Sequence, residues 1–290
     1  MRGFAKFILA SRFNAIFITG FFGAMSLYFL PLSVFSGAAL GLVALRKGLG
    51  QAFYILGVAA ALILASWALI PTRPGFPFPV VYALWAPVLC AAFWLRTTVS
   101  QTKALLAIGA VCGAFVIGMY LSVGDVVAWW NEWILTAMPE VRDPGTAEFG
   151  AGENIRLANG YVAMLLGLAS MFAIVFARWM QSMLFNPGGF ATEFAAIRIP
   201  RSVLVGFLLM LMVSSSVNNQ MMMDLFMVAM MMYFFHGLSV VHGIVLRRRF
   251  NRNWLVIPYI GLFFLPQILI PGLAILGVAD TFVDFRSRRR

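Results

Sequence analysis

The chain has 290 residues, of which 62% are hydrophobic and 11% are charged, with a mean hydropathy of +0.92 and a formal net charge of +11. Soluble domains use about 45–50% apolar and about 25% charged residues, so this composition excludes a soluble globular fold and predicts an integral membrane protein. The basic residues fall in short clusters between apolar runs, which argues against a nucleic-acid-binding domain and favours contact with the membrane surface.

Nine apolar runs are candidates for entry into a bilayer. They are residues 13–30, 32–45, 51–70, 80–95, 104–124, 159–177, 203–217, 221–246 and 254–282. A spanning helix needs about 20 residues. Residues 32–45 fall short of that length, so with residues 13–30 they predict a short, tilted or partly re-entrant pair around Pro31. The sequence therefore predicts an all-α transmembrane bundle of about 8 spans, or up to 10 segments, in a single membrane domain over residues 1–290.

The distribution of cations predicts the orientation of the spans. If the N-terminus is cytoplasmic, 18 of the 21 Lys and Arg residues fall in cytoplasmic segments, as the positive-inside rule requires. Those segments are residues 1–12, 46–50, 96–103, 178–202, 247–252 and 286–290. Most of the acidic residues lie instead in the external loop 125–158.

The same rule makes the last apolar run enter the membrane and return, because arginines on both sides of residues 254–282 are expected in the cytoplasm. Pro266, Pro271 and Gly272 divide this run, and proline interrupts a helix because it lacks a backbone donor. We therefore expect two half-helices or a short hairpin. The alternative is one kinked span with its basic tail outside.

Small residues recur at four-residue spacing in the first apolar run, which places them on one helix face. They are Ala15, Thr19, Gly20, Gly23 and Ala24. Such a face lets another helix approach closely, so it predicts either packing inside the bundle or docking of a partner membrane protein. The pairs Gly37 and Gly41, and Gly109 and Gly113, repeat the pattern.

The external loop 125–158 begins with a tryptophan cluster, Trp129, Trp130 and Trp133. Tryptophan prefers the headgroup level, so this part predicts an interfacial helix. A loop of this length also suits a functional lid, in which Trp129 and Trp133 would contact a ligand.

The cytoplasmic connection 178–202 predicts an interfacial elbow. Asn186, Pro187, Gly188 and Gly189 form a turn sequence, after which Phe190, Phe194 and Ile197 share one helical face that would lie at the membrane surface. The alternative is a coupling loop that contacts a cytoplasmic partner. Its docking candidates are Arg178, Asn186, Gly188, Gly189, Glu193 and Arg198.

Nine of the 17 methionines lie between Met210 and Met232. Met223, Met227 and Met230 share a face and thioethers bind Cu(I), but no cysteine joins them, so an adaptable apolar core is the favoured interpretation and no metal is expected. Polar groups near this segment are candidate ligand contacts, because they are costly at membrane depth. They are Asn218, Asn219, Gln220 and Asp224, which a turn near the surface would also explain, and the deeper His236.

The sequence contains no recognisable set of catalytic residues. The sequence lacks H-E-x-x-H, G-x-S-x-G and P-loop motifs. Asp280 and Asp284 are one helical turn apart, but Arg288 follows Asp284 at four residues, so an ion-paired helix end is the simpler interpretation. We expect neither an enzyme nor a cofactor.

Several stretches together resemble the YybS-like family of uncharacterised bacterial membrane proteins, almost from end to end. They are MRGFAKFILASRFNAIF, PLSVFSGAALGLVALRKG, RWMQSMLFNPGGFATEFAAIRIP, FFHGLSVVHGIVLRRR and LGVADTFVDFRSR. That family is distantly similar to the substrate-capture subunits of energy-coupling-factor transporters, which are shorter and dock on a partner through small residues of the first helix. The resemblance implies a bacterial inner-membrane location and gives Ala15, Thr19, Gly20, Gly23 and Ala24 that docking role.

The sequence therefore favours a transport-related protein that binds a small molecule between its helices, with an energising partner as an additional expectation. A membrane scaffold or assembly factor is the alternative, and a lipid-handling enzyme is the third.

Overall fold

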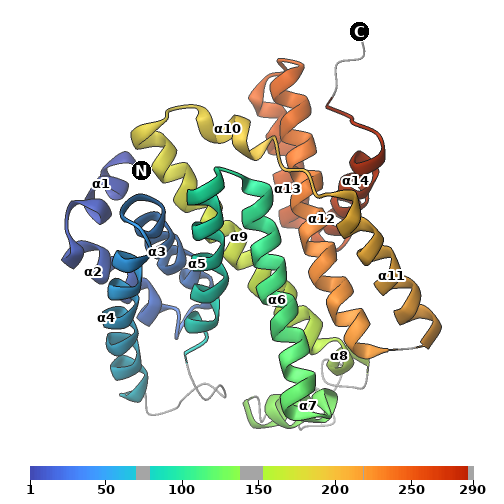
Figure 1. The fold of residues 1–290 in the computed structure, drawn as a ribbon. Coiled ribbons are helices and arrows are strands. Elements are labelled where there is room, and N and C mark those ends of the chain that lie inside the picture. The colour runs from blue at the N-terminus through green and yellow to red at the C-terminus, as the bar shows by residue number, and fades with distance from the viewer. Residues whose placement is uncertain (70–78, 138–152, 218, 287–290) are drawn as a thin grey trace.

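The computed structural model describes residues 1–69, 79–137, 153–217 and 219–286, and all regular elements in these ranges are helical (Figure 1). The α-helices are α1 (Arg2–Ala10), α2 (Arg12–Met25), α3 (Ser33–Lys47), α4 (Leu49–Ala68), α5 (Val81–Thr98), α6 (Gln101–Val123), α7 (Val126–Ala137), α8 (Glu153–Arg156), α9 (Ala158–Phe185), α10 (Gly189–Phe194), α11 (Arg201–Val217), α12 (Gln220–Arg247), α13 (Val256–Phe264) and α14 (Pro266–Phe282). Two 3₁₀ turns, η1 (Leu30–Leu32) and η4 (Arg252–Leu255), precede α3 and α13.

Six of the described helices are long and apolar enough to cross a membrane, or seven if the bent pair α1 and α2 counts as one span. The helices α11, α13 and α14 are apolar but shorter. The all-α membrane bundle that the composition predicts is confirmed. The number of full spans lies slightly below the expected eight, because α11 is short and the last apolar run is divided between two short helices.

The N-terminal run is divided earlier than the sequence indicated. The chain bends by 116° between α1 and α2 at Ser11, which has an extended backbone conformation. The Ser11 hydroxyl accepts a hydrogen bond from the Asn14 N–H (3.0 Å), so it caps the start of α2. A capping serine therefore divides this region ahead of Pro31, and α2 has only 14 residues.

Helix α3 lies at the centre of the N-terminal half and packs on α2, α4, α5 and α9. It has only 15 residues, and all of them from Ser36 to Leu45 are buried. The helix packs closely on its neighbours, because a Cβ at Gly41 would lie 3.3 Å from side chains of both Val88 and Ala177. Its glycines therefore allow α5 and α9 to approach it closely.

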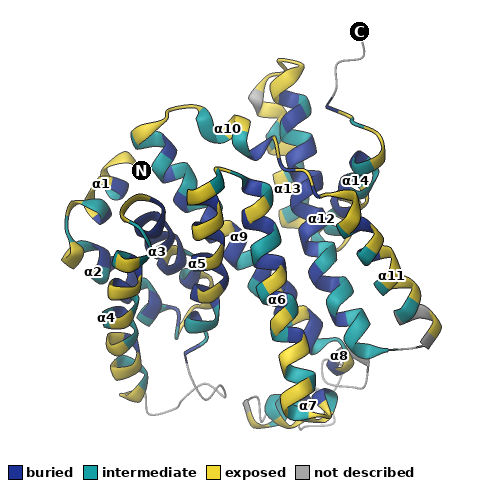
Figure 2. Cartoon of the chain, viewed as in Figure 1, coloured by how far each residue is buried: buried dark blue, intermediate teal, exposed yellow. Residues whose placement is uncertain are grey.

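The methionine-rich helix α12 is mostly buried, and its thioethers fill spaces above glycines of neighbouring helices (Figure 2). Met232 lies against Gly109 of α6, while Met227 and Met231 lie against Gly160 and Gly167 of α9. These contacts agree with the interpretation of the methionines as an adaptable core.

The segments in which the cations concentrate meet at one end of the bundle. Arg96 donates to the Ala44 carbonyl (3.1 Å), and the Arg198 N–H donates to the Thr102 hydroxyl (3.0 Å). Arg247 donates to the Arg286 carbonyl (2.8 Å). Figure 1 shows α10 at this end and α7 and α8 at the other. These cation-bearing segments therefore share one end of the bundle.

The bond between Arg247 and Arg286 also shows that the chain after α12 returns to the end from which it left. Helix α13 stops at Leu265, whose backbone is not helical, and Pro266 occupies the first turn of α14. A proline at this place loses no helical hydrogen bond, and it disfavours a helical conformation in the residue before it. The predicted break at Pro266 is therefore present, whereas Pro271 lies inside α14.

Candidate functional site

Helix α12 carries two buried polar clusters, one in its C-terminal half and one in its first turns. We call the first the arginine cluster: His236 and Ser239 of α12, Asp280 of α14, and Arg286 from the segment that follows α14. Arg286 is 3% exposed and Asp280 is 5% exposed. The Arg286 guanidinium donates to Asp280 Oδ2 (2.5 Å), and His236 Nε2 lies 3.1 Å from the same oxygen. One buried carboxylate oxygen therefore faces two side-chain nitrogens.

Close helix packing brings these groups together. A Cβ on Gly237 of α12 would collide with the Leu273 carbonyl of α14, and a Cβ on Gly277 would collide with the Tyr233 carbonyl. The two backbones touch because both helices have glycine at the crossing. Asp280 follows Gly277 by three residues and so lies on nearly the same face, beside His236.

Arg286 also forms hydrogen bonds that link the elbow 178–202 to α12. Its Nη1 donates to the carbonyls of Ala195 (2.7 Å) and Ile197 (3.0 Å) and to the Ser239 hydroxyl (3.2 Å). A guanidinium offers five donors in a planar fork, which suits a residue that must satisfy a carboxylate and carbonyls at once. The cluster therefore joins α12, α14 and the segment after α10 through one charged side chain.

Three buried polar atoms around this cluster have no partner among the described protein groups: His236 Nδ1, Arg286 Nε and Tyr233 Oη. Buried polar atoms in proteins are normally satisfied by protein or by ordered water. With Nε2 of His236 placed to donate to Asp280, its Nδ1 presents a lone pair. The surroundings of the arginine cluster therefore offer both donors and acceptors to water.

The second cluster, which we call the Asp224 cluster, lies in the first turns of α12. The Tyr120 hydroxyl and the Asn159 amide each donate to Asp224 Oδ2 at 2.9 Å. Gln220 Nε2 lies 3.4 Å from Asp224 Oδ1 and donates more closely to the Arg156 carbonyl (2.5 Å). Asp224 itself is fully buried.

This cluster connects the start of α12 with α6, α7 and α9, because Trp130 of α7 donates to the Asn159 amide oxygen (3.3 Å). The turn that the sequence predicts is present, because α12 begins at Gln220 directly after α11, and Asp224 lies in the first turns of α12, enclosed by protein. The carboxyl is enclosed by Asn159 and Tyr120, and a Cβ on Gly160 would lie 2.8 Å from its Oδ1. Neutral groups alone contact this carboxyl in the described part of the chain.

An apolar groove of about 580 Å³ lies beside α12, between α3, α9, α10 and α13. Its wall is mainly aromatic, and we call it the aromatic groove. The lining residues are Met1, Val34, Phe35, Phe172, Val175, Phe176, Trp179, Phe190, Phe194, Phe235, Leu238 and Tyr259. Ligand sites typically have volumes of about 300–1,000 Å³ and few polar groups.

Tyr259 supplies a polar atom at this groove. Its hydroxyl lies 3.2 Å from His242 Nε2, and His242 Nδ1 lies 2.9 Å from the Leu238 carbonyl. A carbonyl only accepts, so Nδ1 carries the hydrogen and Nε2 accepts from Tyr259 when the ring is neutral. Phe194 packs edge-on against the same imidazole.

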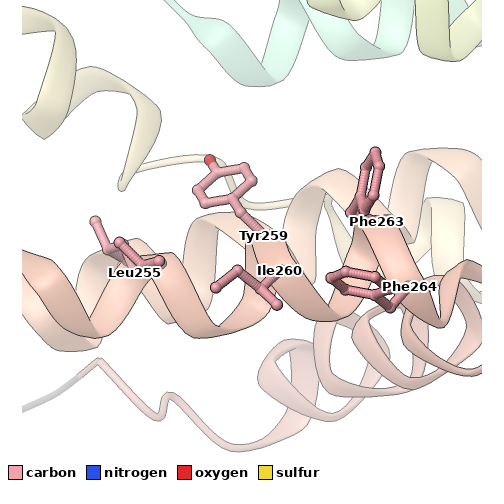
Figure 3. Close-up of a pocket in the computed structure, with 6 residues that line it drawn as sticks. Leu255, Tyr259, Ile260, Phe263 and Phe264 are labelled. Atoms are coloured by element: carbon pink, nitrogen blue, oxygen red, sulfur yellow. The ribbon is translucent and has the colours of Figure 1, made fainter.

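A second hollow, of about 360 Å³, lies on one face of α13. Figure 3 shows Leu255, Tyr259, Ile260, Phe263 and Phe264 along this face, with the Tyr259 hydroxyl as the oxygen among the labelled side chains. Most of these side chains are more than 40% exposed. In a membrane such a face contacts lipid, so it does not define a ligand site by itself.

The ligand contacts predicted from sequence fall into different places. Trp129 and Trp133 stack edge-on against Trp130 in α7. Asn219 caps α12 by accepting from the Met222 N–H (3.2 Å), and Gln220 joins the Asp224 cluster. His236 belongs to the arginine cluster, and Asn218 lies outside the described residues. Gln220 and the tryptophans therefore share one network, which His236 does not join.

The small residues of α2 are used within the chain. Ala15, Thr19, Gly20 and Gly23 are buried, and Ala24 is half-buried. A Cβ on Gly20 would lie 3.7 Å from Leu62 of α4, and Ser36 of α3 donates to the Thr19 carbonyl (2.8 Å). These contacts correspond to packing inside the bundle, the first of the two interpretations of the small residues. In this conformation most of the small-residue face of α2 is covered by the chain itself and is not accessible to a partner.

The elbow has the predicted turn but not the predicted exposure. Gly188 has a φ of +90°, which favours glycine, and the Gly189 N–H donates to the Asn186 carbonyl (3.1 Å). Phe194 and Ile197 are buried rather than lying at the membrane surface, because this segment packs on α12.

The charged docking candidates of the elbow have partners inside the chain. Both Glu193 oxygens accept from Arg178, at 2.8 and 2.7 Å. Arg198 pairs with Asp284. The Arg198 guanidinium holds the pKa of the Asp284 carboxyl below its usual value. Asn186 and Gly188 remain exposed at the turn.

Sequence reasoning missed the partners of the acidic residues. Asp280 and Asp284 were expected at an ion-paired helix end with Arg288, which lies outside the described residues. Within them, α14 ends at Phe282, Asp280 pairs with Arg286 and Asp284 pairs with Arg198. The sequence feature that could have indicated the arginine cluster is Arg286, six residues after Asp280. It could be interpreted only once α14 was known to end before it.

The comparisons with known proteins place part of the chain in a family context. Residues 155–281 match the model of a family described as predicted membrane protein (DUF2232). The matched region runs from α8 into α14, so it contains Asp224, His236 and Asp280. No curated protein and no solved structure matches the chain. With its long apolar helices, the chain is a multi-pass membrane protein.

Proposed function

We propose that this protein binds a small, largely apolar molecule in the aromatic groove, as part of a transport-related role. The observation that carries the proposal is the groove itself, because residues from α3, α9, α10, α12 and α13 converge on one space of about 580 Å³. Side chains from distant parts of the chain form a common wall only when the bundle is folded. A preformed apolar site with few polar atoms suits a hydrophobic ligand.

The polar pair at the groove supports binding of a molecule with a polar end. Tyr259 lines the groove and donates its hydrogen to His242, so its hydroxyl oxygen can accept a hydrogen bond from a donor on the ligand. The aromatic wall would contact the apolar part, since aromatic rings supply large contact areas. Phe176 and Trp179, which stack at 5.6 Å between ring centroids, provide part of that wall.

The location and orientation belong to the same proposal. We infer a bacterial inner membrane, with the cation-rich end of the bundle in the cytoplasm, because 18 of 21 Lys and Arg residues belong to segments assigned to that side. The resemblance to the YybS-like family and to transporter capture subunits supports a role in capture. An energising partner would have to use a surface other than the buried face of α2.

Ligand retention tests the proposal. The full chain is purified in nanodiscs, and bound small molecules are identified by mass spectrometry of the intact complex. Val175 lines the groove and is only half-buried, so Val175→Trp should fill the space and abolish retention. Val205→Trp, on the exposed face of α11, is the matched control and should retain the ligand.

Two results would contradict the proposal. The first is a wild-type protein that carries no small molecule and gains no thermal stability from any member of a hydrophobic metabolite library. The second is equal retention by wild type and Val175→Trp. Orientation is tested separately with reporter fusions after residues 48, 100 and 248, which should all report the cytoplasm, and after residue 137, which should not.

A further inference from the structure

A separate pocket lies at the cation-rich end of the bundle, between the turn that joins α5 to α6 and helix α10. It has a volume of about 340 Å³, and Ser100, Gln101, Thr102, Thr192 and Glu193 line it. This pocket shares no lining residue with the aromatic groove. Its wall carries hydroxyl, amide and carboxyl groups, so it suits a polar ligand.

Gln101 is the unusual member of this wall. It is 2% exposed, yet neither its amide nitrogen nor its amide oxygen has a hydrogen-bond partner among the described residues. An unpaired buried amide is costly, and proteins normally supply a partner from protein, water or ligand. A side chain in this condition that lines a pocket is a candidate partner for water or for a ligand in that pocket.

The start of α6 adds further donors at the same place. The Ser100 hydroxyl accepts from the Lys103 N–H (3.3 Å), which leaves the N–H groups of Gln101 and Thr102 without an acceptor in the helix. The Thr102 hydroxyl accepts from the Arg198 N–H (3.0 Å), so its own hydrogen is available to another acceptor. Helix N-termini bind anions through such N–H groups and through the helix dipole.

The acidic residue of the wall does not oppose an anion strongly. Both Glu193 oxygens accept from Arg178, so this pair is neutral as a unit. The pocket is therefore rich in donors and lacks uncompensated negative charge among its described lining residues.

We propose that this pocket binds a phosphate oxyanion, with the Gln101 amide and the first N–H groups of α6 as donors. A phosphate has several acceptor oxygens and can satisfy donors from different directions. The group comes either from a lipid headgroup or from a soluble phosphorylated molecule, because the pocket lies at the end where cationic segments meet. This site is independent of the aromatic groove.

Thermal unfolding of the full chain tests the site. In nanodiscs of a phosphate-free galactolipid, inorganic phosphate at ten times its dissociation constant should raise the Tm by about 3 °C. Gln101→Leu should lose this response without losing stability in the absence of phosphate, because it removes an unpaired amide. Gln267→Leu, at an exposed position at the start of α14, is the control and should respond like wild type.

A second variant keeps the test decisive if Gln101→Leu does not fold. Ala196 lines the pocket and is exposed, so Ala196→Phe should block the pocket while Gln101 stays intact, and it should also lose the response. Phosphatidylglycerol nanodiscs without added phosphate distinguish the sources. A Gln101-dependent rise in Tm there assigns the lipid headgroup, and its absence with a positive phosphate response assigns a soluble molecule.

The proposal is overturned if phosphate does not raise the Tm of wild type in galactolipid nanodiscs and phosphatidylglycerol nanodiscs give no Gln101-dependent rise either. It is also overturned if Ala196→Phe responds as wild type does. A Gln101→Leu protein that is less stable than wild type without phosphate and still responds fully would show that the amide has a structural partner instead.

Discussion

Removing Arg286 should destabilise the protein more than removing any exposed arginine, because it leaves Asp280 buried with too few donors. Arg286 gives Asp280 its shortest hydrogen bond and also binds two carbonyls and a hydroxyl. After Arg286→Met, Asp280 keeps only His236 and the Phe285 N–H (3.2 Å). Breaking a buried ion pair by removing one partner typically costs about 3–5 kcal/mol, so a loss of this size in the free energy of unfolding is expected.

The matched control is Asp284, four residues after Asp280 in the sequence. Asp284 also pairs with an arginine, Arg198, but both side chains are more than a third exposed. Exposed ion pairs contribute about 0–1 kcal/mol, so Asp284→Asn should change the free energy of unfolding by no more than that. Asp280→Asn, in contrast, should destabilise strongly, because it removes the buried negative charge that faces Arg286.

The measurement is reversible unfolding in mixed micelles, followed by tryptophan fluorescence. A double variant, Asp280→Asn with Arg286→Met, should lose at least about 2 kcal/mol less than the two single losses added together, since the groups interact directly. The reasoning about the arginine cluster is refuted if Arg286→Met and Asp284→Asn differ by less than about 1 kcal/mol. It is equally refuted if the double variant shows simple additivity.

Three further predictions concern other contacts. Gly277→Ala should lower the free energy of unfolding by about 1–3 kcal/mol through collision with the α12 backbone, whereas Gly118→Ala, with open space around it, should change it by less than about 1 kcal/mol. Asp224→Ala should cost about 1–3 kcal/mol by leaving the donors of its cluster unpaired, and an unchanged Tm would contradict this. Because the pKa of Asp284 is lowered by Arg198, its small stabilisation is present above the ordinary Asp pKa of about 3.9 and is lost as the pH falls through the lowered value. The difference in Tm between wild type and Asp284→Asn should therefore shrink on acidification, and high salt should shrink it as well.

The sequence predicted those features that depend on neighbouring residues. Apolar runs predicted the long helices, because a membrane helix satisfies its backbone internally and needs only length and apolarity. The cations predicted which loops lie at the same end, and Asn186 to Gly189 predicted the turn before α10 because glycine accepts a positive φ. The break at Pro266 followed from the missing N–H of proline.

Other features needed the folded bundle, because hydropathy does not say which helix faces which. The sequence alone allowed α2 to dock on a partner, but its small residues pack on α3 and α4. Nor could it give the partner of Asp224, which accepts a hydrogen bond from Tyr120 across a sequence separation of 104 residues.

Asp280 illustrates the difference most clearly. Local spacing paired it with Asp284 at a helix end, while the contact between Gly237 and Gly277 places it beside His236 and within reach of Arg286. The amino-acid sequence by itself determined that the chain is a bundle of membrane helices with its cations at one end, since those properties follow from the apolarity and charge of each segment. Only the tertiary structure decided which buried charges meet, because that depends on how closely two distant helices approach one another.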